Sequence, residues 1–170
     1  MSEDKAPGSL HWLWLAAAVV VADQLTKALI ESRFELWEVL EVWPVLDITR
    51  LHNTGAAFSL LANASGWQRW FFIALGTGVS VGIVFWLRSL PRQVAPWLPL
   101  GLALLMGGAL GNVIDRVRFG YVIDFLHFHW EGAYFPAFNV ADTAITIGAG
   151  LLILDALLEG RRARKAEGEA

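Results

Sequence analysis

The chain has 170 residues, of which 56% are hydrophobic and 17% charged, and its apolar residues are gathered in long blocks, a pattern typical of an integral membrane protein. The net charge of −3 gives no reason to expect nucleic-acid binding, and the lack of cysteine excludes disulfides, a thiolate nucleophile and cysteine-based metal sites. Several of the nine tryptophans lie beside the ends of apolar blocks, where amphipathic rings anchor proteins at the membrane interface.

Four stretches meet the requirement of roughly 20 mainly apolar residues for a spanning helix. The first has the features of a retained helix and not of a cleaved signal peptide, because it is long, contains Asp23 and Lys27, and is followed by no small-residue cleavage pattern. We expect one membrane-embedded domain over residues 1–170. Its predicted spans are about Leu10–Ile30, Trp67–Leu87, Trp97–Asp115 and Phe138–Leu158.

Positively charged residues predict the orientation of these spans. Basic residues follow the fourth span and also lie between the second and third, and the positive-inside rule places both segments in the cytoplasm. The opposite loops also hold arginines, so the bias is moderate but points one way. We expect both termini, including the tail 159–170, to be cytoplasmic. The cytoplasmic basic residues are Arg88, Arg92, Arg161, Arg162, Arg164 and Lys165.

Two external segments, 31–66 and 116–137, are longer than plain linkers. Val42–Leu51 is rich in β-branched and aromatic residues and predicts a strand, with Asn53–Gly55 as a turn. The second segment is aromatic and only partly polar, which suits a position in the membrane interface. The predicted fold is a membrane all-α protein with a small β element: four transmembrane helices, an external β-sheet segment and an external interfacial helix or loop.

Glycines in the second and third spans predict close helix packing, because they let helix backbones approach one another. The residues concerned are Gly66, Gly76, Gly78, Gly82, Gly107, Gly108 and Gly111.

Polar residues from distant parts of the chain fall near the external ends of the predicted spans. Ionisable residues at membrane depth are costly, and by default they indicate a functional site. The set comprises Asp23, Lys27, Asn112, Asp115, Arg116, Asp124, Asn139 and Asp142.

Most of these residues also have a purely structural interpretation. Asp23 and Lys27 are four residues apart and can form an ion pair on one helix face. Asn139 precedes Asp142 by three residues, as an N-cap precedes an acidic N3 residue. This capping role does not exclude a second one.

Other members of the set differ in how readily a structural role explains them. Asp115 and Arg116 can end a helix at the lipid headgroups, and Asn53–Ala57 can be only a turn. Asp124 is harder to explain as a solvated residue, because its neighbours Val122–Phe125 are otherwise apolar.

Two carboxylates from separate segments at one membrane face suggest an aspartyl dyad, in which one group holds a proton while the other accepts one from water. The sequence has no Gly-x-Ser-x-Gly and no His-Glu-x-x-His pattern. A metal site formed by Asp124, His127 and His129 is an alternative, although their spacing matches no metal-binding motif well.

Five sequence blocks resemble those of one known family, the lipoprotein signal peptidases (signal peptidase II). Its signature blocks are similar to Gly107–Arg116 (GGALGNVIDR), Gly120–Phe125 (GYVIDF) and Phe138–Asp142 (FNVAD). Its earlier blocks are similar to Asp23–Lys27 (DQLTK) and Asn53–Phe58 (NTGAAF).

The resemblance extends over about residues 22–158 and implies an aspartyl endopeptidase of the bacterial inner membrane. Such an enzyme removes signal peptides from prolipoproteins by cutting before a cysteine that already carries diacylglycerol. The resemblance implies that Asp124 and Asp142 are the catalytic pair. It also implies residues that support the site or contact the substrate, namely Asp23, Lys27, Asn53, Gly55, Asn112, Asp115, Arg116, Asn139 and Ala141.

The resemblance further implies a small periplasmic sheet within 31–66, a periplasmic helix and loop within 117–137, and an active site near the periplasmic face. The resemblance implies partners that are lipid-modified prolipoproteins and membrane lipids. Because the sequence has no cysteine and no clear metal-ligand pattern, we expect no cofactor or metal. We expect a monomer. The main alternative function is a small transporter or channel, but a pathway should leave polar residues along the full depth of the spans, and the inner halves are almost entirely apolar. A membrane scaffold with a structural polar cluster is a third interpretation, and it predicts tolerance of Asp→Asn substitutions.

Overall fold

Four long helices and a small antiparallel sheet form the structure, a computed structural model in which residues 8–55, 65–91 and 94–168 are described. The helical elements are η1 (Ser9–Trp12), α1 (Leu13–Arg33), α2 (Trp67–Ser89), α3 (Trp97–Arg118) and α4 (Val140–Gly168). The strands are β1 (Val39–Trp43), β2 (Leu46–Asn53), β3 (Val122–Trp130) and β4 (Ala133–Tyr134).

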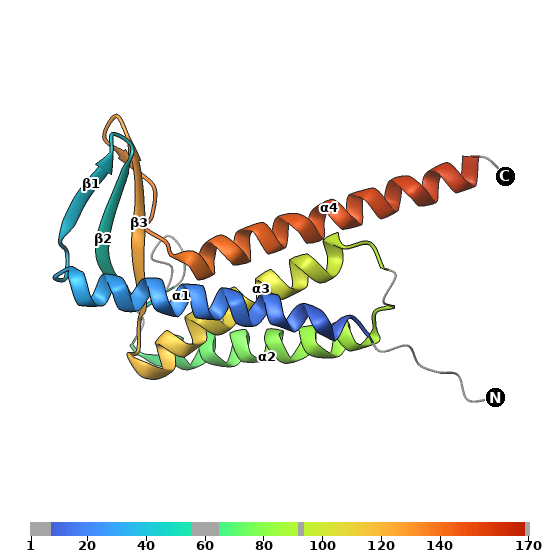
Figure 1. Cartoon of the computed structure of the whole chain (residues 1–170), viewed down its shortest axis with the longest axis horizontal. Helices are drawn as coiled ribbons and strands as arrows, with labels where there is room; N and C mark the ends of the chain where they lie inside the picture. Colours follow the sequence, from blue (N-terminus) through green and yellow to red (C-terminus); the bar gives the residue numbers. More distant parts are fainter. Residues whose placement is uncertain (1–7, 56–64, 92–93, 169–170) are drawn as a thin grey trace.

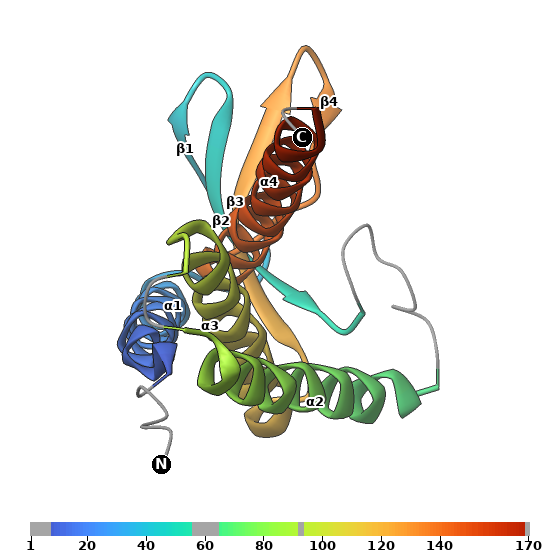
Figure 2. The same cartoon turned by 90° about the vertical axis from the view of Figure 1, so that its right-hand side faces the viewer.

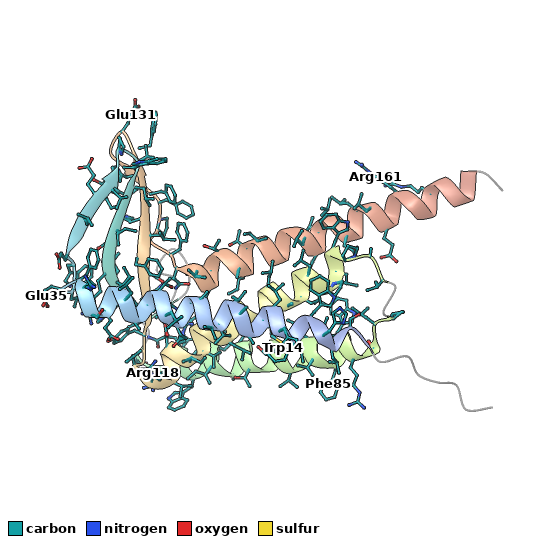
Figure 3. All side chains as sticks on the ribbon, viewed as in Figure 1. Trp14, Glu35, Phe85, Arg118, Glu131 and Arg161 are labelled. Atoms are coloured by element: carbon teal, nitrogen blue, oxygen red, sulfur yellow. The ribbon has the colours of Figure 1, made fainter. Side chains whose placement is uncertain are left out.

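The four predicted spans are confirmed as helices that are long and apolar enough to cross a membrane. Large apolar side chains along them face outward, as Trp14 (82% exposed) and Phe85 (66% exposed) do between the charged ends of the molecule (Figure 3). Only α4 runs far beyond its predicted end at Leu158, because most of the residues that follow are glutamates, alanines and basic residues, which are good helix formers.

Helix α3 lies at the centre and packs against α1, α2 and α4. Its glycines allow this: a Cβ added to Gly107 would lie 2.7 Å from Val19 Cβ on α1, and one added to Gly108 would collide with the backbone carbonyl of Ala141 on α4. Close packing is therefore confirmed for the glycines of the third span. In the second span, Gly76 approaches α3, whereas a Cβ added to Gly78 would meet nothing within 4 Å.

The sheet stands across one end of the helices, which we call the sheet end, and its strands run across the helix direction (Figure 1). The last turns of α1 and α3 and the first turns of α2 and α4 lie at this end, whereas α4 finishes at the opposite end (Figures 1 and 2). The strand order is β1-β2-β3-β4, and each neighbouring pair is antiparallel. Ile30 of α1 packs with Ile123 and Phe125 of β3 and so fixes the sheet to the helices.

Two expectations for the external segments were wrong in detail. Val42–Leu51 is not one strand, because a turn at Pro44 and Val45 separates β1 from β2 and proline has no N–H for a continuing ladder. The predicted turn after β2 is present, and the backbone N–H of Gly55 donates to Asn53 Oδ1 at 2.9 Å.

The second correction concerns 116–137, where strands β3 and β4 replace the expected interfacial helix or loop. The run Val122–Trp130 is β-branched and aromatic, and β2 supplies backbone partners for it. Gly120 allows the sharp entry to β3, because its φ of 87° lies in the left-handed region that glycine adopts without strain.

Candidate active site

The two candidate catalytic aspartates lie at the junction of the sheet with α4. Asp124 is the third residue of β3, opposite Leu51 of β2, and its side chain is 3% exposed. The chain before α4 is fixed to β3 by reciprocal backbone hydrogen bonds between Leu126 and Phe138, of 2.9 and 3.0 Å. This pairing carries the start of α4, with Asp142 in its first turn, to the side of β3.

Asn139 joins the two aspartates directly. Its Nδ2 donates to Asp124 Oδ1 at 2.7 Å, and its Oδ1 accepts the backbone N–H of Asp142 at 2.9 Å. The predicted capping interaction at the start of α4 is therefore present, and the same side chain also reaches the other carboxylate. Asn139 is completely buried, so both bonds are shielded from water.

Two further asparagines donate to the same carboxylates. Asn53, at the end of β2, donates to Asp124 Oδ2 at 3.0 Å. Asn112, on α3, donates to Asp142 Oδ1 at 2.8 Å. Each aspartate is thus held by an amide from an element other than its own.

A buried charge cluster lies behind Asn112. Lys27 Nζ lies 2.8 Å from Asp23 Oδ2 and 2.8 Å from Asp115 Oδ2, and all three side chains are at most 2% exposed. The predicted pairing of Asp23 with Lys27 is confirmed, whereas Asp115 does not end a helix at the headgroups. Asp23 Oδ1 also accepts the backbone N–H of Ala141 at 2.9 Å, which links α1 to α4.

Arg116 is also held inside the structure. Its Nη2 donates to the backbone carbonyl of Gly55 at 2.7 Å, and its guanidinium lies 4.8 Å from the ring centroid of Phe72. Arg116 is 8% exposed, so the alternative of a side chain reaching the headgroups is wrong for it as well. The block Asn53–Phe58 extends beyond Gly55 into 56–64, outside the described residues.

A cavity of about 500 Å³ opens beside these groups. Its lining is mainly apolar, and the polar side chains in it are Asn53, Asn112, Arg116, Asp142, Thr143 and Thr146. Asp124 is not part of the lining, but Asn53, which donates to Asp124, borders the cavity. The apolar lining residues include Phe72, Val122, Phe135, Phe138, Ile145 and Ile147.

The environment of Asp124 favours a carboxyl group that can hold a proton near neutral pH. Burial raises its pKa to about 7, and the charge of Asp142 acts in the same direction, while hydrogen bonds from Asn53 and Asn139 and the charge of Lys27 oppose the shift. Because neighbouring carboxylates seldom ionise together, this arrangement can keep one acid and one base side by side. Such a pair can exchange protons with a water molecule and with a leaving group.

The metal alternative requires Asp124, His127 and His129 to converge, and the structure separates them. Side chains alternate along a strand, so residue 124 lies on the opposite face of β3 from 127 and 129. His129 Nε2 lies 3.2 Å from Asp47 Oδ1, and His127 stacks on Tyr134. Within the described residues, no group of three metal-binding side chains comes together.

Two contributors were not anticipated. Gln24 Nε2 donates to Asp115 Oδ1 at 2.8 Å and so joins the charge cluster. A polar amide next to Asp23 in an otherwise apolar span could have indicated this role from the sequence. Phe72 lies under Arg116 and lines the cavity, but nothing distinguishes it from other aromatic residues of α2 in the sequence.

Comparisons with known proteins identify the family. Residues 15–158 match the family model described as signal peptidase (SPase) II. The lipoprotein signal peptidase of Shewanella woodyi is 51% identical over 87% of this chain and 84% of its own length, and that of Ectopseudomonas mendocina is 48% identical over 98% and 99%. A solved bacterial membrane enzyme superposes with a TM-score of 0.78 at 34% identity, covering 91% of this chain and 92% of the other. The chain therefore belongs to the signal peptidase II family of lipoprotein signal peptidases.

Proposed function

We propose that this chain removes signal peptides from prolipoproteins by aspartyl catalysis, with Asp124 and Asp142 activating a water molecule. The observation that carries the proposal is Asn139, which bonds to Asp124 Oδ1 and to the backbone N–H of Asp142 at the edge of the cavity. Such a shared partner holds the two carboxyl groups in place relative to one another, and two carboxyl groups held close together titrate as a coupled pair.

In the proposed reaction, Asp142 is the base and Asp124 the acid. The Asp142 carboxylate accepts a proton from water as the water oxygen bonds to the carbonyl carbon, and the proton of Asp124 is donated toward the carbonyl oxygen. When this tetrahedral intermediate collapses, Asp142 passes its proton to the leaving nitrogen and Asp124 recovers its own. The peptide C–N bond breaks, giving one carboxyl and one amine product and no covalent enzyme intermediate.

The mainly apolar lining of the cavity supports a lipid-modified substrate. A second cavity of about 230 Å³, lined by α2, α3 and α4, shares Phe72, Asn112, Arg116 and Ile145 with the first. Together the two cavities form a mainly apolar route between α2 and α4 that leads to the polar groups of the site. Such a route suits a signal helix and the acyl chains of a diacylglyceryl cysteine, because both can move through lipid without exposure to water.

The distribution of arginines supports a site near the periplasmic face of a bacterial inner membrane, with both termini cytoplasmic. Arg161 lies at the end of the molecule opposite the sheet (Figure 3). The arginines of the sheet end that oppose this orientation are partly bound within the fold: Arg50 donates to the carbonyl of Phe34 and Arg69 to that of Val117, both at 3.0 Å. With these bound arginines set aside, the positive-inside rule places the basic end opposite the sheet in the cytoplasm.

The experiment is cleavage of a prolipoprotein by the purified enzyme in lipid nanodiscs, with the substrate cysteine either diacylglyceryl-modified or unmodified. We expect cleavage of the modified form, and about a thousandfold or greater loss of turnover in Asp124→Asn and in Asp142→Asn, because asparagine cannot exchange the shared proton. Both variants should still bind uncut substrate in a pull-down. Asp155→Asn is the matched control, since Asp155 lies on α4 outside the site and should tolerate the change. Near wild-type turnover in either site variant would contradict the dyad.

A further inference from the structure

The three asparagines of the site share one arrangement, in which a donor holds each amide oxygen. Asn53 Oδ1 accepts the backbone N–H of Gly55, and Asn139 Oδ1 accepts that of Asp142, both at 2.9 Å. Asn112 Oδ1 accepts from Lys27 Nζ at 3.1 Å. Since the two ends of a carboxamide have nearly the same shape, its orientation is decided by such neighbours.

With each oxygen engaged, each NH₂ group is directed at a catalytic carboxylate. Asn53 and Asn139 owe this orientation to backbone N–H groups, which are fixed by the fold. Asn112 depends chiefly on a side chain, because its other donor, Asn139 Nδ2, lies 3.5 Å from Oδ1 and is already bonded to Asp124 at 2.7 Å. Of the three asparagines, Asn112 is therefore the one whose amide can lose its fixed orientation through a single side-chain substitution.

We infer that Lys27 is a positioning residue of the proposed hydrolysis, whose ammonium group keeps Asn112 turned so that its NH₂ donates to Asp142. This inference rests on the proposed function. Lys27 is 2% exposed and does not line either cavity, so it acts through another residue and not on the substrate. Its three N–H donors are divided among Asp23, Asp115 and Asn112, and charge pairing alone requires no contact with Asn112.

The simpler alternative is that Lys27 only neutralises Asp23 and Asp115. In that case, removing the ammonium would lower stability and disturb the site to the same extent whether or not Asn112 is present. If Lys27 acts through Asn112, removing the Lys27 ammonium should lower kcat only in a protein that still has the Asn112 amide. Residues that share one interaction show this non-additivity, whereas independent residues contribute separately.

The test is a double-mutant cycle on kcat and KM in lipid nanodiscs, using Lys27→Met and Asn112→Ala singly and together. We expect Lys27→Met to lower kcat about 10- to 100-fold with KM nearly unchanged, and to lower it less than about threefold in the Asn112→Ala background. The matched control repeats the cycle with Asn53→Ala, because Asn53 serves Asp124 and shows no contact with Lys27. There the full loss from Lys27→Met should persist.

Equal losses in the wild-type and Asn112→Ala backgrounds would overturn the inference, as would wild-type kcat in Lys27→Met. If Lys27→Met does not fold, Lys27→Met with Asp115→Asn is compared with Asp115→Asn alone, since the double variant keeps the single net negative charge of the original cluster. If the double variant also failed to fold, the inference would be overturned, because Lys27 would then be required for the stability of the fold. Failure of the proposed function is recognised separately, by an inactive wild type or an active Asp124→Asn.

Discussion

Asn139 performs two tasks at one residue, and substitutions can separate them. Serine is also a good N-cap, so Asn139→Ser should retain an acceptor for the backbone N–H of Asp142 while losing the amide that donates to Asp124. We expect kcat to fall by about 100-fold or more. The free energy of unfolding should fall by only about 1–3 kcal/mol, because a buried carboxyl loses one donor while the cap is kept. Activity assays beside thermal unfolding in detergent would check this. An active Asn139→Ser would leave Asn139 with a capping role alone.

Asp124 should also make stability depend on pH. Its pKa is raised from the ordinary 3.8 to about 7, chiefly by burial, so the folded protein retains a proton there that the unfolded chain releases above pH 4. The stabilising contribution is therefore complete below about pH 4 and is lost as pH rises toward and through 7. We expect Asp124→Asn, which cannot ionise, to gain in Tm relative to wild type between pH 5 and pH 8. Parallel Tm curves for the two proteins would show that Asp124 does not titrate in this range.

The same residue predicts the alkaline side of the activity profile. If Asp124 supplies the proton of the dyad, kcat/KM should decline as pH rises above about 7, because the fully ionised pair lacks an acid. Activity that stays level to pH 9 in nanodiscs, with substrate binding unchanged, would contradict the assignment of Asp124 as the acid.

At the scale of the elements, the helices were predictable because length and hydropathy act locally along the chain. Strand β3 was not, since Val122–Trp130 contains aromatic residues that suit an interfacial helix or loop equally well. Its partner β2 lies some 70 residues earlier in sequence, as the pairing of Leu51 with Asp124 shows. The turn at Pro44 was visible in the sequence, but the surrounding β-branched run outweighed it.

The contact between α3 and α4 gives a prediction at the same scale. Gly108→Ala should be destabilising by about 1–3 kcal/mol, because the added methyl group would collide with the carbonyl of Ala141 and push apart two closely packed helices. Turnover should fall too, since Asp142 follows Ala141 directly. Gly78→Ala is the control, because a Cβ there meets nothing within 4 Å and alanine favours the helix. Equal Tm values for the two variants would show that α3 and α4 do not pack this closely.

In the whole molecule, the site exists only where the sheet, α1, α3 and α4 meet. The five sequence blocks predicted which residues gather there, but not the contacts between them. Asn53 reaches Asp124 only through the register of β2 against β3, and Ala141 reaches Asp23 only through the close approach of α1 to α4. Such contacts depend on long-range packing, whose geometry a one-dimensional pattern does not contain.

Orientation in the membrane can be tested directly, because the chain has no cysteine of its own. Single cysteines are introduced as Glu131→Cys at the tip of the sheet and as Arg161→Cys at the opposite end, two positions that lie far apart along the molecule (Figure 3). A thiol reagent that cannot cross membranes is added to intact spheroplasts. With the sheet end in the periplasm, Glu131→Cys is labelled at once and Arg161→Cys only after lysis, because the positive-inside rule keeps the basic end of α4 in the cytoplasm. The reverse labelling pattern would show the opposite orientation, with the aspartates at the cytoplasmic face. A signal peptide translocated across the membrane does not present its cleavage site there.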